Sequence, residues 1–267
     1  MSDGRPVAVV TGASSGIGKA TVRELARRGW LCVLLARRAD RLEAVAAEVG
    51  GEWEVCDVSD RAEVDEVAAR LLERHPSITL LVNNAGMPAR GSFLEIDAAL
   101  IERVIDVNYL GGVWCLRAFL PGLRAGAGAE GSRGAHVVNL VSVAGTVAFA
   151  PAGAYASAKH AQLAFSRSTA ALLRGTGITV HAVLPGFVET EGFPQGNLSS
   201  RLLQRFVIEP ERVATKLVDA VESGKRETTV PWFPYRLISI AQALVPGVFA
   251  RFVSGSGYRA EGEKTRV

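Results

Sequence analysis

The chain has 267 residues, of which 48% are hydrophobic and 21% charged, so it can bury a sizeable core without disulfide or metal staples. Its 30 Lys and Arg residues nearly balance 27 Asp and Glu, and no run of five or six basic residues forms a nucleic-acid-binding arm. We therefore expect no nucleic-acid partner and a single α/β domain over residues 1–267.

The cysteines and the N-terminus bear on the cellular compartment. Cys32, Cys56 and Cys115 show no CxxC or Cys/His spacing, so we expect reduced thiols and no metal site. From Met1 to Arg5 the chain leads straight into a strand-like run, which leaves no room for the apolar stretch of a signal peptide. These features predict a cytoplasmic protein.

Short apolar runs alternate with helical periodicity along the first half of the chain. Asp60 and Glu63 resemble a capping box at the start of one of these helices. The predicted strands are 7–10, 31–35, 53–56 and 80–82, and the predicted helices are 17–28, one through 42–49, and 60 to about 75.

The same alternation continues in the second half, with two interruptions. A Gly- and Ala-rich segment at 125–134 is predicted to be a surface loop, and 192–200 is a second loop-like segment. Strands are predicted at 136–140, 179–183 and 228–230, with a helix at 154–173. Strands that are apolar on both faces and alternate with helices predict a doubly wound, Rossmann-type parallel sheet.

A glycine-rich turn between the first strand and the first helix is the first candidate site. Glycines let the backbone approach a pyrophosphate, whose charge then lies at the positive end of the helix. A plain Gly/Ser turn is the alternative interpretation. The candidate cofactor residues are Gly12, Ser14, Ser15, Gly16, Ile17 and Gly18.

Five further segments follow this turn in order, and together they identify a family. They are Asn83 to Gly86 after the fourth strand, Asn108 in a helix, Ser142 at the end of the fifth strand, Tyr155 with Lys159, and Pro185-Gly186 after the sixth strand. With TGxxxGIG they resemble the single-domain branch of the short-chain dehydrogenases/reductases, over about Val7 to Val230. The resemblance implies hydride transfer between a nicotinamide cofactor and a small-molecule ketone, aldehyde or alcohol.

Tyr155 and Lys159 are four residues apart, so they share one face of a helix. An ammonium beside a phenol favours the phenolate, so we expect Lys159 to lower the pKa of Tyr155. The alternative is an ordinary amphipathic helix with a partly buried Tyr and a snorkelling Lys. Ser142, at the carboxyl end of a strand where α/β sheets bind ligands, favours the catalytic interpretation.

The resemblance also implies roles for the catalytic set. Tyr155 would protonate the carbonyl oxygen, Ser142 would polarise it, and Lys159 would tune Tyr155 and bind the nicotinamide ribose. Asn108 matches the family's asparagine that holds a water in a proton relay to Lys159. Its alternative role is to satisfy a local kink in its helix.

The remaining cofactor contacts are implied in the same way. Arg37 and Arg38 follow Ala36, the position where NAD enzymes usually place an acid, so they favour the 2′-phosphate of NADP(H). Against this, Ser15 stands where some NADP enzymes place a basic residue. Glu189 and Glu191 are interpreted as solvated charges. The residues implied in binding are Asn84, Ala85 and Gly86 at the adenosine ribose, Asp57 and Val58 at the adenine, and Pro185, Gly186, Val188 and Thr190 at the nicotinamide.

The C-terminal part departs from the family. Residues 232–255 form an apolar extension that is interrupted by Pro246 and too short to span a bilayer. Its apolar face must be buried: on its own domain, on a partner subunit of a homodimer or homotetramer, over the predicted substrate loop 190–205, or on a membrane surface through 233–253. A cover over that loop would favour bulky or lipophilic substrates. A nucleotide-binding redox sensor and a sugar-nucleotide-modifying enzyme remain the alternative functions.

Overall fold

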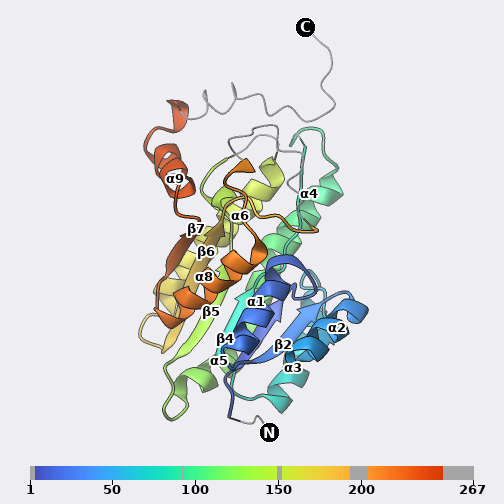
Figure 1. Cartoon of the computed structure of the whole chain (residues 1–267). Coiled ribbons are helices and arrows are strands. Elements are labelled where there is room, and N and C mark those ends of the chain that lie inside the picture. Colours follow the sequence, from blue (N-terminus) through green and yellow to red (C-terminus); the bar gives the residue numbers. More distant parts are fainter. Residues whose placement is uncertain (1–3, 92, 149–151, 193–203, 249–267) are drawn as a thin grey trace.

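Seven parallel strands form the sheet at the centre of the molecule, in the order β3-β2-β1-β4-β5-β6-β7 (Figure 1). The computed structural model describes residues 4–91, 93–148, 152–192 and 204–248. The predicted Rossmann-type sheet is thereby confirmed. Its strands are β1 (Val7–Thr11), β2 (Leu31–Ala36), β3 (Glu52–Val55), β4 (Leu80–Asn83), β5 (Ala135–Leu140), β6 (Ile178–Pro185) and β7 (Glu227–Val230).

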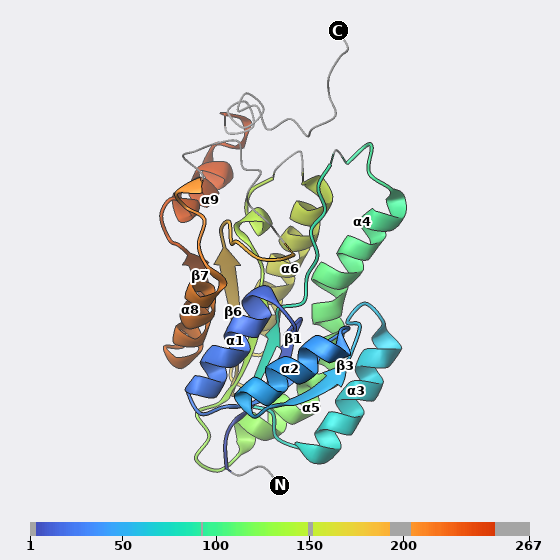
Figure 2. The same ribbon diagram turned by 45° about the vertical axis from the view of Figure 1, so that its right-hand side comes forward.

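Helices cover both faces of the sheet, which makes the fold doubly wound. On one face, α1 (Gly16–Arg27), α2 (Ala39–Val49) and α8 (Pro210–Glu222) bury one hydrophobic core against the sheet. On the other face, α3 (Arg61–Arg74), α5 (Gly111–Gly128) and α6 (Gly153–Leu172) pack around a second core. Helices α1 and α8 lie side by side in Figure 1, and Figure 2 brings α1 and α2 to the front of the sheet.

The predicted capping box at the start of α3 is half right. The Asp60 carboxylate accepts hydrogen bonds from the backbone N–H groups of Ala62 and Glu63, at 2.9 and 3.2 Å, so Asp60 is the N-cap. The backbone N–H of Asp60, however, donates to the carbonyl of Asp57 rather than to a returning Glu63 side chain. The turn between β3 and α3 therefore satisfies this donor locally.

The predicted loop at 125–134 is partly wrong, because α5 continues to Gly128. The glycines in this part of the chain permit close packing and do not mark a turn. A Cβ on Gly126 would lie 2.2 Å from the carbonyl oxygen of Ile78, and one on Gly122 would lie 2.5 Å from Leu72. The Gly-rich composition predicted a loop, but these glycines lie in α5. They let the helix pack closely against Ile78, just before β4.

The apolar extension is not buried on its own domain as a whole. Helix α9 (Tyr235–Leu244) buries Tyr235 and Ser239, and helical structure resumes at Pro246, as the interrupted helix predicted. Its outer face stays exposed, with Leu237 at 46%, Ile240 at 42% and Leu244 at 76% exposure. That outer face is therefore not buried against the described part of its own domain, and its burial on a partner subunit, over the loop 190–205 or on a membrane surface stays a prediction.

Residues 249–255 of the extension, and 193–203 of the predicted substrate loop, lie outside the described residues. Within the described part of the chain, no helix is both long and apolar enough to cross a bilayer.

Candidate active site

The end of β1 is tied to the end of β4 by Thr11 and Asn84. The Thr11 hydroxyl accepts hydrogen bonds from the backbone N–H groups of Asn84 and Ala85, both at 3.0 Å. The Asn84 amide donates to the carbonyls of Thr11 and Gly12, at 2.8 and 3.2 Å. Asn84 was expected to line a ribose. The structure shows its amide nitrogen bracing the glycine-rich turn at the point where the strand order reverses, the usual ligand crevice of such sheets.

The glycine-rich turn leaves the space that a pyrophosphate needs. Gly12 and Gly16 have positive φ angles of 64° and 53°, which favour glycine. A Cβ on Gly18 would lie 2.3 Å from the carbonyl oxygen of Gly12, so the first turn of α1 also requires glycine there. The turn ends at the N-terminus of α1, whose dipole attracts an anion. The local structure therefore fits a dinucleotide.

Two arginines at the end of β2 face different neighbours. The Arg38 guanidinium donates to the hydroxyls of Ser14 and Ser15, at 3.1 and 2.9 Å, and so lies against the glycine-rich turn. Arg37 lies 3.6 Å from the Asp57 carboxylate. Partial burial opposes ionisation of Asp57, but hydrogen bonds from Ser59 and the nearby Arg37 and Arg103 charges outweigh it and lower the Asp57 pKa.

Glu191 is not a freely solvated charge, contrary to its sequence interpretation. Its carboxylate accepts a hydrogen bond from Arg41 at 2.5 Å and lies 3.6 Å from Arg38. The Arg41 hydrogen bond lowers the pKa of Glu191. The chain after β6 is thus linked by charge to the start of α2, beside the turn that holds Ser14 and Ser15.

Ser142 and Tyr155 meet at the carboxyl end of β5 and β6. Ser142 begins a short 3₁₀ turn, η2 (Val143–Gly145), two residues after β5 ends, and its hydroxyl accepts a hydrogen bond from the Ala144 backbone at 3.1 Å. The Ser142 side chain lies close enough to the Tyr155 hydroxyl to lower the Tyr155 pKa. The two hydroxyls therefore converge on one place, where both could contact a single substrate oxygen.

The expected effect of Lys159 on Tyr155 is not what the structure shows. Burial raises the pKa of Tyr155 to about 12, and the nearby Ser142 side chain acts against this only in part. The Lys159 ammonium lies 5.8 Å from the centre of the Tyr155 ring and donates to the Leu140 carbonyl and to the Gln162 side chain, both at 2.8 Å. Burial also lowers the pKa of Lys159 to about 7. The prediction of a lowered Tyr155 pKa is therefore wrong.

Asn108 lies in a π-helical turn, η1 (Asp106–Leu110), between α4 (Ala98–Ile105) and α5. Its amide donates to the carbonyls of Met87 and Val104, both at 3.0 Å, and its oxygen accepts from the Met87 backbone at 3.2 Å. This is the kink-satisfying role. A Cβ on Gly86 would lie 2.8 Å from the Asn108 oxygen, which explains the glycine there.

The segment after β6 contacts helix α9 on one side and the glycine-rich turn on the other. A Cβ on Gly186 would lie 2.1 Å from the Tyr235 ring, so α9 packs directly on the Pro185-Gly186 turn. The Tyr235 hydroxyl accepts a hydrogen bond from the Phe187 backbone at 3.3 Å and donates to the Phe206 carbonyl at 3.2 Å. The Thr190 side chain faces Gly16, whose Cβ would lie 3.3 Å from it. Thr190 and the glycine-rich turn are thus brought together.

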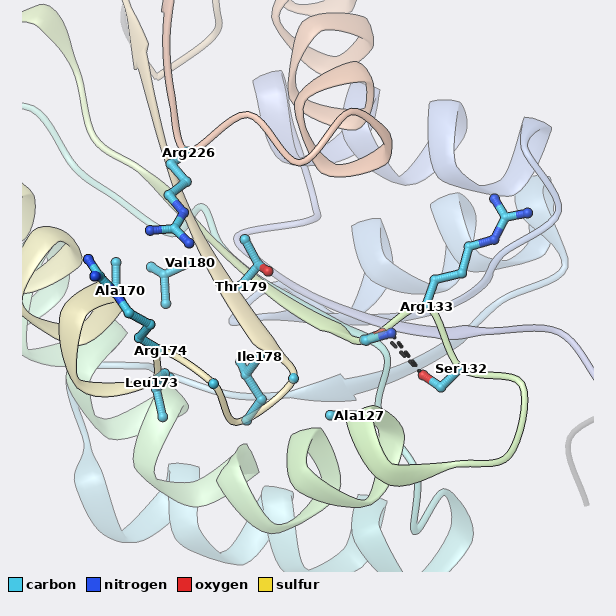
Figure 3. Close-up of a pocket in the computed structure, with 13 residues that line it drawn as sticks. Ala127, Ser132, Arg133, Ala170, Leu173, Arg174, Ile178, Thr179, Val180 and Arg226 are labelled. Atoms are coloured by element: carbon cyan, nitrogen blue, oxygen red, sulfur yellow. Dashed lines mark hydrogen bonds between the residues drawn. The ribbon is translucent and has the colours of Figure 1, made fainter.

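A cavity of about 410 Å³ lies at the opposite edge of the sheet (Figure 3). It is lined by Ala127 near the end of α5, Leu173 just after α6, and Ile178 at the start of β6. Helix C-termini present carbonyl groups, so the arginines around it, including Arg174 and Arg226, suit the negative ends of these helices. This cavity lacks the helix N-terminus that a dinucleotide phosphate prefers.

Sequence reasoning missed three residues that the structure places in or beside the site. Gln162 hydrogen-bonds Lys159 and lies three residues after it, so the i,i+3 spacing was an available signal. Glu191 pairs with Arg41, and Tyr235 packs on Gly186. These two contacts join segments far apart in the sequence, and no local pattern predicts them.

The family model for short chain dehydrogenases matches residues 6–198. A 1-deoxy-11-beta-hydroxypentalenate dehydrogenase from Streptomyces exfoliatus is 37% identical over 192 residues, covering 68% of this chain and 67% of that protein. A short chain dehydrogenase from Burkholderia cenocepacia, solved with NADP, has a TM-score of 0.79 and 25% identity, covering 93% of this chain and 97% of that one. A short chain dehydrogenase/reductase from Burkholderia phymatum, solved with NAD, has a TM-score of 0.77 and 28% identity, covering 90% and 95%.

Proposed function

This chain belongs to the short-chain dehydrogenase family, and from that premise we propose that it interconverts a ketone or aldehyde and its alcohol with NADP(H). Membership makes it a hydride-transfer oxidoreductase that binds a nicotinamide cofactor. The relatives do not favour a redox sensor or a sugar-nucleotide-modifying enzyme. The observation that supports the proposal best is that Ser142 lies beside Tyr155, with Lys159 on the same helix, at the ligand-binding edge of the sheet.

The proposed mechanism assigns each side chain one task. In reduction, the Tyr155 hydroxyl donates its proton to the carbonyl oxygen while Ser142 donates a hydrogen bond to that oxygen. The Lys159 ammonium would stabilise the phenolate that Tyr155 becomes and would bind the nicotinamide ribose, and Asn108, whose side chain also satisfies the helix kink, would hold the relay water. The bound nicotinamide supplies the hydride. Because burial keeps the Tyr155 hydroxyl protonated, proton transfer requires the Lys159 ammonium to stabilise the phenolate as it forms.

The preference for NADP(H) rests on the charges at the end of β2. Arg37 and Arg38 follow Ala36, so no acid at that position repels a 2′-phosphate. Arg38 already donates to two hydroxyls of the glycine-rich turn, and a phosphate there would be a stronger acceptor for its guanidinium. Asp57 and Val58 are proposed at the adenine, and Val188 and Thr190 at the nicotinamide.

A direct assay tests the proposed reaction. Purified protein is mixed with NADPH and a panel of ketones and aldehydes, and oxidation is followed by loss of the absorbance of the reduced nicotinamide. We expect turnover with at least one carbonyl compound and product formation equal to the NADPH consumed. Tight NADPH binding without turnover of any carbonyl or alcohol would contradict the enzyme and favour the sensor.

Three further properties belong to the same proposal. Residues 1–267 are taken as one catalytic domain, and the cytoplasm is the proposed location because Cys32, Cys56 and Cys115 are buried free thiols. A homodimer or homotetramer is proposed because the outer face of α9 is apolar and exposed on the single chain. Contact of the same face with a membrane surface is the alternative.

We also propose that the substrate is bulky or lipophilic. Helix α9 lies against the turn that follows Ser142, with the Thr146 and Ser239 hydroxyls 2.7 Å apart. Val143, Val147 and Tyr235 form an apolar cluster there. Each substrate methylene that this cluster removes from water contributes up to about 0.8 kcal/mol to the free energy of substrate binding.

Charges on the exposed face of α9 test this idea. If the exposed face of α9 extends the wall formed by Val143, Val147 and Tyr235, kcat/KM of a Leu237→Glu, Ile240→Glu protein should fall about tenfold more for long-chain than for short carbonyl substrates, because the lost apolar contact equals a few methylenes. Tyr235 and Ser239 are left intact, so α9 keeps its buried contacts. Leu172→Glu, an exposed leucine at the end of α6, is the matched control. An unchanged substrate ranking with a smaller oligomeric mass would assign the face to a subunit contact instead.

A further inference from the structure

Lys159 is hydrogen-bonded to Gln162, a buried residue outside the catalytic set. Lys159 is 3% exposed and Gln162 is 2% exposed, and both lie on α6. A buried ammonium needs hydrogen-bond acceptors, because it has lost its water. The Gln162 side-chain oxygen is one acceptor, at 2.8 Å, and the Leu140 carbonyl at the end of β5 is the other, also at 2.8 Å.

These two bonds determine where the third N–H group of Lys159 points. A lysine ammonium has three N–H donors in tetrahedral arrangement and no acceptor. When two of them are directed at Leu140 and Gln162, the direction of the third is set by geometry. The third N–H is then the one available for the ribose and the Tyr155 phenolate of the proposed mechanism.

A buried polar chain meets α6 at the backbone carbonyl of Gln162. The Ser166 hydroxyl donates to the Gln162 backbone carbonyl at 2.7 Å and accepts from the Asn139 amide at 2.9 Å. The Asn139 oxygen accepts from the Asn83 amide, again at 2.9 Å. The chain runs from β4 through β5 to α6 and contacts only the backbone carbonyl of Gln162, so it does not hold the side-chain oxygen that faces Lys159.

We propose that Gln162 is a positioning residue that aims the Lys159 ammonium and keeps it charged, a role that rests on the proposed function. Its amide oxygen favours the charged form of Lys159, because only the ammonium can donate to it with full charge assistance. A neutral Lys159 would neither stabilise the Tyr155 phenolate nor hold the ribose as firmly. Gln162 acts through Lys159 and not on the substrate.

The titratable groups around Lys159 make the pH test interpretable. The Tyr155 ring faces the ammonium, and burial is the cause of the lowered pKa of Lys159. The titratable side chains on α6 and on the elements that pack against it are Tyr155, His160 and Arg167 of α6, Glu102 and Arg103 of α4, Asp106 and Tyr109 of η1, His136 of β5 and His181 of β6. The variants below change none of them.

Two substitutions of Gln162 should move the lysine pKa in opposite directions. Gln162→Met keeps the length and removes the acceptor, so Lys159 should titrate at lower pH. Gln162→Glu adds a carboxylate, so Lys159 should titrate at higher pH. The measurement is the pH dependence of the side-chain carbon shift of Lys159 in lysine-labelled protein, together with the pH profile of kcat. For Gln162→Met we expect kcat to fall about tenfold or more, and its loss at high pH to begin earlier.

Ser166→Ala is the matched control, because Ser166 belongs to the same buried chain but does not contact Lys159. It should lower the melting temperature and leave the lysine titration unchanged. Equal shifts in Ser166→Ala and Gln162→Met, or an unshifted Lys159 in Gln162→Met, would overturn the proposal. If Gln162→Met does not fold, the test rests on Gln162→Glu. An unchanged Lys159 titration in that variant would also overturn the proposal. The lysine titration needs no turnover, so failure of the proposed reaction is seen separately in the NADPH assay.

Discussion

Replacing Tyr155 with phenylalanine is expected to lower kcat by about 10³-fold, within the range that a general acid contributes. The substitution removes only the hydroxyl beside Ser142, and the ring keeps its packing against the cluster that includes Ala89 and Val104. The proposed cofactor contacts of Lys159 and of the glycine-rich turn would remain. Dissociation constants for NADPH, measured by fluorescence titration, should therefore stay within a few-fold of the unmodified protein.

A second tyrosine provides the control for this prediction. Tyr109 lies on η1, and its ring packs edge-on against Phe165 with 6.2 Å between centroids. Tyr109→Phe also removes a hydroxyl, but one that is not beside Ser142. We expect kcat to change less than about threefold, because substitutions of partly exposed side chains outside the catalytic set have small effects. Near-normal turnover by Tyr155→Phe would rule out Tyr155 as the proton donor.

Placing acids at the end of β2 is expected to reverse the cofactor preference. In Arg37→Asp, Arg38→Asp, two guanidinium donors become carboxylates that repel a 2′-phosphate and can accept a hydrogen bond from a 2′-hydroxyl. We expect the ratio of kcat/KM for NADPH over NADH to fall by about 10³-fold, since each lost charge-assisted contact is worth tenfold or more. Steady-state kinetics with both cofactors measure this ratio.

The single variants separate the two arginines. Arg38 lies on the glycine-rich turn through Ser14 and Ser15, whereas Arg37 is 3.6 Å from Asp57. Arg23→Asp is the control, because Arg23 pairs with Glu48 at 2.7 Å on the outer surface of α1 and α2. It should leave the ratio unchanged. An unmodified enzyme that already prefers NADH would refute the assignment of both arginines.

Much of the fold was determined by local patterns in the sequence. Runs such as Val7 to Val10 are apolar on both faces, and this pattern occurs only in strands that are covered on both sides. The positions of Gly12, Gly16 and Gly18 between strand and helix predicted a turn that leaves space for a pyrophosphate. The i,i+4 spacing of Tyr155 and Lys159 placed them on one helix face. Each of these inferences depends on neighbours within a few residues.

Tertiary structure decided the properties that depend on burial and on distant partners. The sequence predicted that Lys159 would lower the Tyr155 pKa, but desolvation raises it, and the ammonium is turned toward Leu140 and Gln162. The glycines of α5 were interpreted as a loop because their need for close packing on Ile78 comes from a contact outside the helix. Solvent exposure and long-range contacts are properties of the packed chain, so no window of sequence contains them.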